Sequence, residues 1–132
     1  MKKFLYIVLL LITVSYSTFA KKLQASLNYA TFYSPVDGPY IETYFSVNGN
    51  SVVFAWNENG LFRATIEIAM IFRQDEKIVN FKKYELLSPE IRDTTSVAVD
   101  FIDQQRIPLP VGKYDFELSI TDKNNRKESY VH

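Results

Sequence analysis

The sequence predicts an all-β protein, an antiparallel, immunoglobulin-like β-sandwich of about seven strands. Every second residue of Leu61–Phe72 is apolar, Tyr114–Ile120 alternates in the same way, and turn-forming residues separate the extended stretches. A period of two places these side chains on one face of a strand, and such a face needs a second apolar layer over it. The two faces are Phe62, Ala64, Ile66, Ile68, Met70 and Phe72, and Tyr114, Phe116, Leu118 and Ile120.

The other strands follow from shorter runs of the same kind. Asn48-Gly49-Asn50 predicts a tight hairpin, because Asn and Gly tolerate the left-handed backbone of a type I′ turn. Asn57-Glu58-Asn59-Gly60 predicts a second turn, so three successive strands are expected to form a meander. The expected strands are Leu23–Tyr33, Tyr40–Asn48, Ser51–Trp56, Ile78–Leu87 and Thr94–Ile102, and Lys127–His132 begins a returning strand.

Polar or proline-containing segments separate these later strands. Gln74–Lys77 predicts a turn, and Ser88–Glu90 is more consistent with a loop than with a helix cap. Lys82 and Lys83 are expected on a sheet edge, where charge discourages further pairing.

The stretch Ile107–Asp122 has the most specific local pattern. Pro108 and Pro110 are expected to prevent regular pairing ahead of the strand. Gly112 supplies a turn, and Tyr114 just after it resembles the tyrosine corner of immunoglobulin-like sandwiches. The chain has no cysteine, so the Cys…Trp…Cys core of antibody domains is absent and only the architecture is predicted.

Met1–Ala20 has the pattern of a secretory signal peptide, and residues 21–132 are predicted to be a single domain. Lys2 and Lys3 precede the apolar run Phe4–Val14, which is shorter than the ~20 residues that span a bilayer. An uncleaved anchor is the alternative. Without cysteine there is no lipid anchor and no disulfide, so an exported, periplasmic or extracellular domain must be stabilised by burial. The formal net charge is zero, which argues against a nucleic-acid partner.

The sequence predicts no catalytic, cofactor-binding or metal-binding residues, and therefore not an enzyme. His132 is the single histidine and the last residue, so the catalytic triads and zinc sites that need histidine or cysteine are not expected. Asp115 and Glu117 are expected on the solvated face of one strand. Asp122 and Asn124 supply too few oxygens for calcium and suit a turn better.

Binding is the remaining possibility, because tyrosines and the single tryptophan concentrate in the first half of the chain. Tyr40 and Tyr44 share the strand face opposite Ile41, Phe45 and Val47. Exposed together, aromatic rings form a platform for a sugar ring or an apolar patch of a partner. Cross-strand packing is the alternative explanation. The candidate ligand or partner surface is Tyr40, Tyr44 and Trp56.

Three stretches, Gly38–Val53, Lys82–Pro89 and Asp103–Asn124, resemble the N-terminal region of the secreted GWxTD-domain proteins of Bacteroidetes-type bacteria. The resemblance implies a signal peptide, a β-sandwich and a longer continuation, and it implies no catalytic residue. The naming Gly-Trp-x-Thr-Asp motif does not occur, since Trp56 stands between Ala55 and Asn57.

Two functions are compatible with these observations. The first is a non-catalytic structural or protein–protein interaction module of a cell-envelope protein, with another envelope protein or further domains as partner. The chain stops at Tyr130-Val131-His132 within an expected hairpin, so a truncated product, or one domain of a longer protein, with an open strand edge is expected. The alternative is a carbohydrate-binding module that uses Tyr40, Tyr44 and Trp56.

Overall fold

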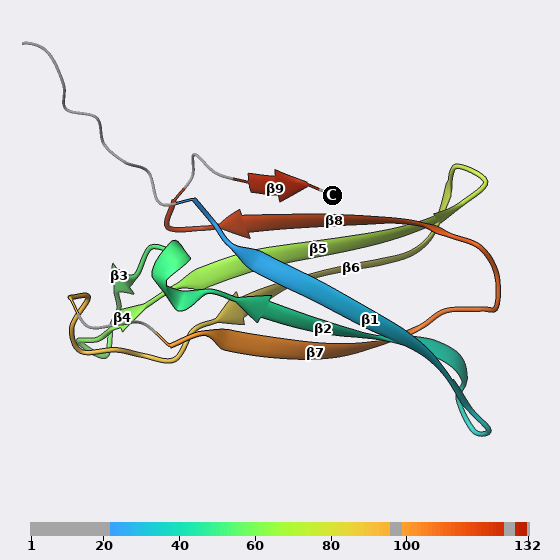
Figure 1. Cartoon of the computed structure of the whole chain (residues 1–132), viewed down its shortest axis with the longest axis horizontal. Coiled ribbons are helices and arrows are strands. Elements are labelled where there is room, and N and C mark those ends of the chain that lie inside the picture. The colour runs from blue at the N-terminus through green and yellow to red at the C-terminus, as the bar shows by residue number, and fades with distance from the viewer. Residues whose placement is uncertain (1–21, 96–98, 126–128, 132) are drawn as a thin grey trace, which may run out of the picture.

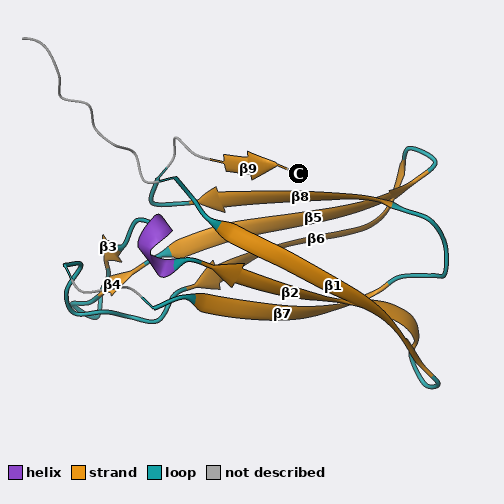
Figure 2. Cartoon of the chain, in the orientation of Figure 1, coloured by secondary structure: helices purple, strands orange, loops and turns teal. Residues whose placement is uncertain are grey.

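A computed structural model describes residues 22–95, 99–125 and 129–131, so the predicted signal peptide lies outside the described residues. The fold is all-β with antiparallel sheets arranged as a sandwich (Figures 1 and 2). The first sheet has the order β1-β2-β7, with β1 Ala25–Ser34, β2 Gly38–Val47 and β7 Phe101–Pro108. The second has the order β6-β5-β8-β9, with β6 Lys77–Leu87, β5 Thr65–Gln74, β8 Asp115–Asp122 and β9 Ser129–Val131. A separate pair joins β3 Ala55–Trp56 to β4 Phe62–Arg63, and η1 Gly49–Ser51 is a short 3-10 helix.

The core lies between the two sheets and is built from alternate residues of four strands. The alternation predicted for Leu61–Phe72 is confirmed, because Ile66, Ile68 and Met70 have no exposed surface. The remaining core side chains of β2, β5, β7 and β8 are Ile41, Phe45, Val47, Phe72, Phe101, Ile107, Leu118 and Ile120. Since both sheets contribute, each one covers the apolar face of the other.

The predicted hairpin at Asn48-Gly49-Asn50 is wrong. These residues lead into η1 instead, where the Asn48 side chain accepts a hydrogen bond from the Asn50 backbone N–H at 2.9 Å. The segment 51–56 does not pair with β2, whose neighbours are β1 and β7. The predicted meander is therefore wrong as well. Asn-Gly chemistry supports either a hairpin or a helical turn, and here the helical turn leads the chain from β2 to the separate β3–β4 pair.

The strand predicted over Leu61–Phe72 is interrupted at Ala64. The Ala64 N–H donates to Ser88 Oγ at 2.9 Å, and the Ser88 N–H donates to Ala64 O at 3.0 Å. Ser88 is buried and begins a loop, as its neighbour Pro89 predicted. A side-chain hydroxyl thus replaces one bond of the strand ladder and separates β4 from β5.

The strand predicted over Thr94–Ile102 is wrong in position where it can be compared, because residues 96–98 lie outside the described residues and residues 94, 95, 99 and 100 are not in a strand. The chain forms a turn at Thr94 and Thr95, and the next strand, β7, begins at Phe101 and continues to Pro108. Asp103 and Gln105 lie at inward-facing register positions. The inward face of β7 therefore lacks the apolar alternation that predicts a strand. The expectation that Pro108 prevents regular pairing is wrong, because Pro108 pairs with Tyr40 at the end of β7, an edge strand where proline is tolerated.

Other local predictions are confirmed. Residues 75 and 76 form a two-residue hairpin turn between β5 and β6, and Gly60 closes the β3–β4 turn with a φ of 71°. β6, which carries Lys82 and Lys83, is an edge strand of the second sheet. Tyr114 donates its hydroxyl hydrogen bond to Pro110 O at 2.6 Å, the contact expected of a tyrosine corner.

In the part of the chain that is described, no helix is both long and apolar enough to cross a bilayer.

Candidate functional site

One long side of the sandwich is open, between β1 and β8. Because β2 is fully covered by the second sheet, its inward residues Ile41 and Phe45 are only 5% and 1% exposed. On β1, the inward residues Tyr29 and Tyr33 are 63% and 72% exposed, although Tyr29 sits opposite buried Thr43. Among the described side chains, the second sheet therefore covers β1 only in part, at Leu27, which packs against the core.

A hollow of about 520 Å³ occupies this open side, and we call it the β1–β8 groove. Most of the side chains that line it are apolar, among them Leu27 of β1 and Phe116 and Leu118 of β8. A smaller hollow of about 210 Å³ adjoins it at Leu23. The full lining of the groove is Ala25, Ser26, Leu27, Tyr29, Phe116, Leu118 and Ile120.

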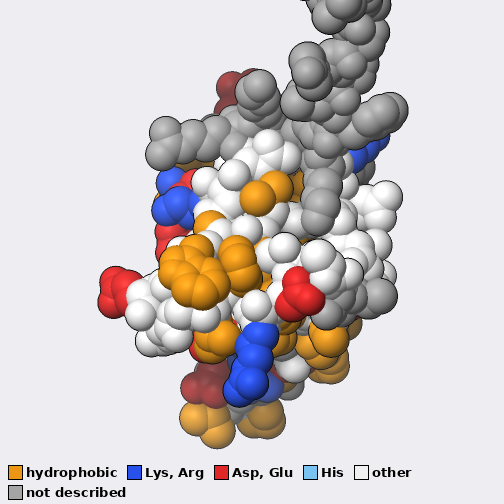
Figure 3. Space-filling view, turned by 90° about the vertical axis from the view of Figure 1, so that its left-hand side faces the viewer, with side chains coloured by type: hydrophobic (Ala, Val, Ile, Leu, Met, Phe, Trp, Pro, Cys, Tyr) orange, Lys and Arg blue, Asp and Glu red, His pale blue; other side chains and the backbone are white. Residues whose placement is uncertain are grey.

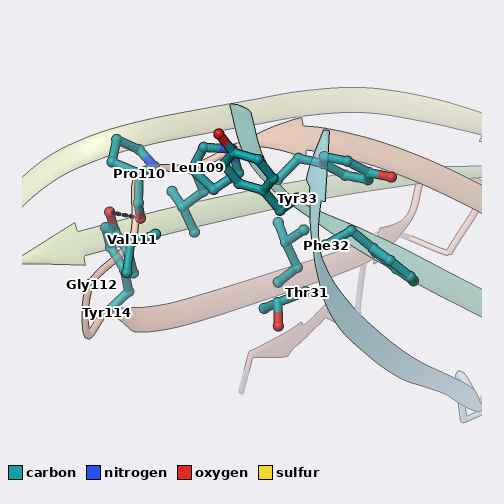
Figure 4. Close-up of a pocket in the computed structure, with 11 residues that line it drawn as sticks. Thr31, Phe32, Tyr33, Leu109, Pro110, Val111, Gly112 and Tyr114 are labelled. Carbon is teal, nitrogen blue, oxygen red and sulfur yellow. Dashed lines mark hydrogen bonds between the residues drawn. The ribbon is translucent and has the colours of Figure 1, made fainter. Parts of the chain in front are cut away.

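A further hollow of about 440 Å³, the end pocket, lies toward the β1–β2 turn (Figure 4), and its lining includes inward residues such as Tyr33 as well as outer-face residues such as Tyr40. Its walls come from the end of β1, the start of β2 and the loop between β7 and β8. The Tyr114–Pro110 hydrogen bond fixes the shape of that loop. The lining is Thr31, Phe32, Tyr33, Pro39, Tyr40, Ile41, Leu109, Pro110, Val111, Gly112 and Tyr114.

The backbone edge of β1 borders both hollows and is unprotected. Within the described residues β1 pairs only with β2, so one edge of this ten-residue strand has no strand partner. β1 contains no charged residue and no proline. The other long edge strands, β6 and β7, carry several charges, among them Lys82, Lys83 and Arg106. Charge and proline are the usual devices that keep an edge from pairing, and β1 lacks both.

The sequence analysis did not identify this groove. The signal was present, because Ala25–Ser34 is an uncharged run of alternating side chains next to a predicted turn. What the sequence could not supply was the position of β1 at a sheet edge, which depends on long-range pairing.

The predicted residues Tyr40 and Tyr44 lie on the opposite, outer face of the first sheet. Tyr40 is half-buried, its ring stacks on Phe32 with centroids 5.5 Å apart, and the Arg106 guanidinium lies 4.7 Å from its centroid. Tyr44 is 40% exposed, and its hydroxyl donates to Glu42 Oε2 at 2.5 Å. For Tyr40, the cross-strand packing alternative describes what is observed.

Glu42 is a buried carboxylate at the centre of this outer face. It accepts hydrogen bonds from Tyr44, from Gln104 Nε2 at 3.2 Å, and from Arg106 Nε and Nη2 at 3.1 and 2.7 Å. The Tyr44 hydrogen bond, followed by the Arg106 contacts, lowers the pKa of Glu42 below its ordinary value. The same bond raises the pKa of the Tyr44 hydroxyl. The carboxylate is fully occupied by its neighbours, so it orders the face rather than offering a free acid or base.

A shallow hollow of about 370 Å³ lies beside Tyr44 on this face. Asn28 and Gln104 sit opposite Tyr44 on the two neighbouring strands, and Ser26 and Ser46 form the next row. The hollow therefore combines one exposed ring with amide and hydroxyl groups.

Trp56 is not part of either face. It lies in β3, at the end of the molecule where β4 and η1 are found, whereas β2 begins at the other end (Figure 1). Its ring is 65% exposed and meets Phe62 edge-on, with centroids 5.0 Å apart. Hydrophobic side chains gather on this end of the molecule (Figure 3). The three predicted aromatic residues are thus not assembled into one platform.

Three of the residues considered for chemistry, Glu117, Asp122 and Asn124, have structural contacts, whereas Asp115 is exposed on the same strand. Asp122 is buried and accepts from Val53 N–H at 2.8 Å and from Asn124 N–H at 3.0 Å. Asn124 Nδ2 donates to Val53 O at 2.9 Å. Glu117 pairs with Arg73 at 2.5 Å on the outer face of β8. Across the described ranges, no three acidic or histidine side chains are grouped as metal ligands.

No known protein family, curated protein or solved structure matches the chain.

Proposed function

We propose that this protein is an exported, non-catalytic module of the cell envelope that binds a partner protein by accepting an extended segment of it along β1. The observation that carries the proposal is the unprotected edge of β1 above an apolar groove. An added strand supplies main-chain hydrogen bonds to the edge, and its inward side chains fill the hollows beneath.

The expected affinity is modest. Two side chains buried in the groove and the end pocket contribute about 3–6 kcal/mol, while association itself costs several kcal/mol. The strand hydrogen bonds add roughly 0.5–1.5 kcal/mol each. A short segment is therefore expected to bind in the micromolar to millimolar range, and a longer or tethered one more tightly.

The exported, envelope location rests on the sequence alone. The pattern of Met1–Ala20 supports export, and the resemblance of Gly38–Asn124 to GWxTD-domain proteins supports an envelope context. Neither feature suggests a reaction, which is consistent with a binding role.

Selection from a displayed library of short random peptides tests the proposed function, with two lysine variants as the comparison. Tyr29→Lys places a charge over the groove, whereas Ile102→Lys places the same charge at an exposed position on the outer face of β7, away from the edge of β1. Peptides selected on the wild type are expected to lose binding to Tyr29→Lys and to keep it with Ile102→Lys. Equal binding to both variants would exclude the groove as the site.

A sugar-binding function remains the second candidate, because the hollow beside Tyr44 combines a ring with Asn28 and Gln104 amides. Sugar sites in proteins commonly use this combination of ring stacking and amide hydrogen bonds. Titration with neutral oligosaccharides, followed by NMR of the Asn28 and Gln104 side-chain amides, tests it. No shift in either amide at millimolar sugar would remove this candidate.

A further inference from the structure

We infer that the segment bound along β1 is an extended strand, antiparallel to β1, with two bulky apolar side chains four residues apart. This inference rests on the proposed function and specifies its ligand. It follows from the spacing of the two hollows along β1 and from the pairing pattern of the first sheet.

The spacing comes from the inward-facing positions of β1. The groove lies beside Leu27 and Tyr29, and the end pocket beside Thr31 and Tyr33. Leu27 and Thr31 are four residues apart, as are Tyr29 and Tyr33, and all four share the inward face. A strand added in register presents its inward residues with the same period of two. An anchor opposite the same member of each pair, Leu27 and Thr31 or Tyr29 and Tyr33, gives a separation of four residues.

The secondary structure of the ligand follows from the same distance. Four residues of an extended strand span about 13 Å, whereas in a helix residues four apart lie about 6 Å from each other. A helical segment with this spacing would place both anchors over one hollow. The unpaired backbone groups of β1 would also stay unsatisfied against a helix, because helical backbone groups are already bonded internally.

The direction follows from continuity with the existing sheet. Every described strand pair in this protein is antiparallel, including β1 with β2. Antiparallel pairing is slightly more stable per residue than parallel pairing. The N-terminal anchor then lies in the end pocket near Tyr33, and the C-terminal anchor lies in the groove near Leu27. Because β1 and the lining of both hollows are uncharged, the anchors themselves are uncharged.

Threonine-rich peptides with lysine ends and two leucines test this inference. One peptide has the leucines four positions apart, a second has the same composition with the leucines five apart on opposite faces, and a third is the first with alternate backbone amides N-methylated on the β1-facing side. We expect the first to bind by fluorescence anisotropy, and the second and third to bind about tenfold more weakly or worse. A nitroxide at the N-terminus of the first peptide is expected to broaden the amide NMR signal of Tyr33 more than that of Leu27.

The outcomes separate the two proposals. If the two unmethylated peptides bind alike, the methylated peptide binds weakly and Tyr29→Lys abolishes binding, the two-anchor spacing is wrong and the proposed function stands. Equal binding by the methylated peptide overturns strand addition itself, and with it the proposed function. Absence of binding by the first peptide at millimolar concentration, or broadening centred on Leu27, also overturns the inference. Library-selected peptides that ignore Tyr29→Lys overturn the proposed function instead.

Discussion

The Tyr84 hydroxyl on β6 donates a hydrogen bond to Asp103 Oδ2 on β7 at 2.7 Å, joining the two sheets along the side opposite the groove. Gln105 Nε2 also donates to Asp103, and Lys82 reaches Gln105 from β6. Asn80 Nδ2 donates to Pro108 O at 2.8 Å further along. One side of the sandwich is thus closed by polar contacts between strands of different sheets, while the β1 side stays open.

Replacing Tyr84 with Phe is expected to lower the free energy of unfolding by about 1–3 kcal/mol, because the Asp103 carboxylate loses a donor in a partly buried site. Burial, together with the bond to Asp103, raises the pKa of Tyr84, so its hydroxyl stays protonated and keeps donating well into alkaline solution. Urea denaturation measures the loss.

Tyr33→Phe is the matched control, because Tyr33 is 72% exposed and its change is expected to be within about 0.5 kcal/mol. A Tyr84→Phe protein as stable as the control would show that packing, and not this hydrogen bond, joins β6 to β7.

Glu42 is expected to make stability depend on acidity. Its folded-state pKa lies below its ordinary value, so its contribution is present above that value and disappears as the pH falls through the folded pKa. Glu42→Gln should therefore be less stable than the wild type at pH 7, and the difference should shrink toward acid pH. Denaturant midpoints measured from pH 7 to about pH 3 check the trend, with the exposed Glu58→Gln as control. A difference that grows toward acid pH would contradict this assignment.

The β5–β6 turn offers a stabilising substitution. Asp75 and Glu76 have φ angles of 50° and 66°, the left-handed backbone of a type I′ turn that favours Asn-Gly. Glu76→Gly is expected to raise the free energy of unfolding by roughly 0.5–1 kcal/mol, since relieved strain exceeds the added entropy of the unfolded chain. Thermal and urea denaturation measure the gain.

Gly38→Ala, at the start of β2, is the reverse substitution and serves as the control. Gly38 has a φ of 81°, and an added Cβ would meet no atom within 4 Å, so the expected loss of about 1 kcal/mol is a backbone effect alone. A destabilising Glu76→Gly would mean that the Glu76 side chain stabilises the turn more than its backbone strains it.

Asp122→Ala is expected to destabilise the protein by about 1.5–3 kcal/mol. The substitution leaves the Val53 and Asn124 N–H groups without their carboxylate acceptor. The Val53 amide should exchange with solvent faster than in the wild type, which hydrogen exchange followed by NMR measures. Asp115→Ala, an exposed change on the same strand, should leave both quantities nearly unchanged. If the Val53 amide exchanges at the same rate in Asp122→Ala as in the wild type, contacts other than Asp122 order the segment between η1 and β3.

The sequence predicted elements well where burial on one face dominates. Ile66, Ile68, Leu118 and Ile120 alternate because each strand has one covered face, and that pattern is local. β7 was misplaced because Asp103 and Gln105 point inward and are satisfied by strand β6, a contact that no local window contains.

The candidate site was harder to predict for a related reason. Tyr40 and Tyr44 were placed correctly on an outer face, but Trp56 was separated from them by the change of sheet after η1. Local turn chemistry at Asn48 does not determine which sheet the next strand joins. The groove depends on β1 having one partner rather than two, which is a property of the complete sheet.

Both sheets are completed by strands from the last third of the chain. β7 pairs with β2 from Val47 to Tyr40, and β8 pairs with β5 from Ile66 to Arg73. Without those later strands, the described pairings that remain are the hairpins β1–β2, β3–β4 and β5–β6, and an isolated two-stranded hairpin is marginal in water. We therefore expect the earlier strands to gain stable order during translation only after β8 has been synthesised.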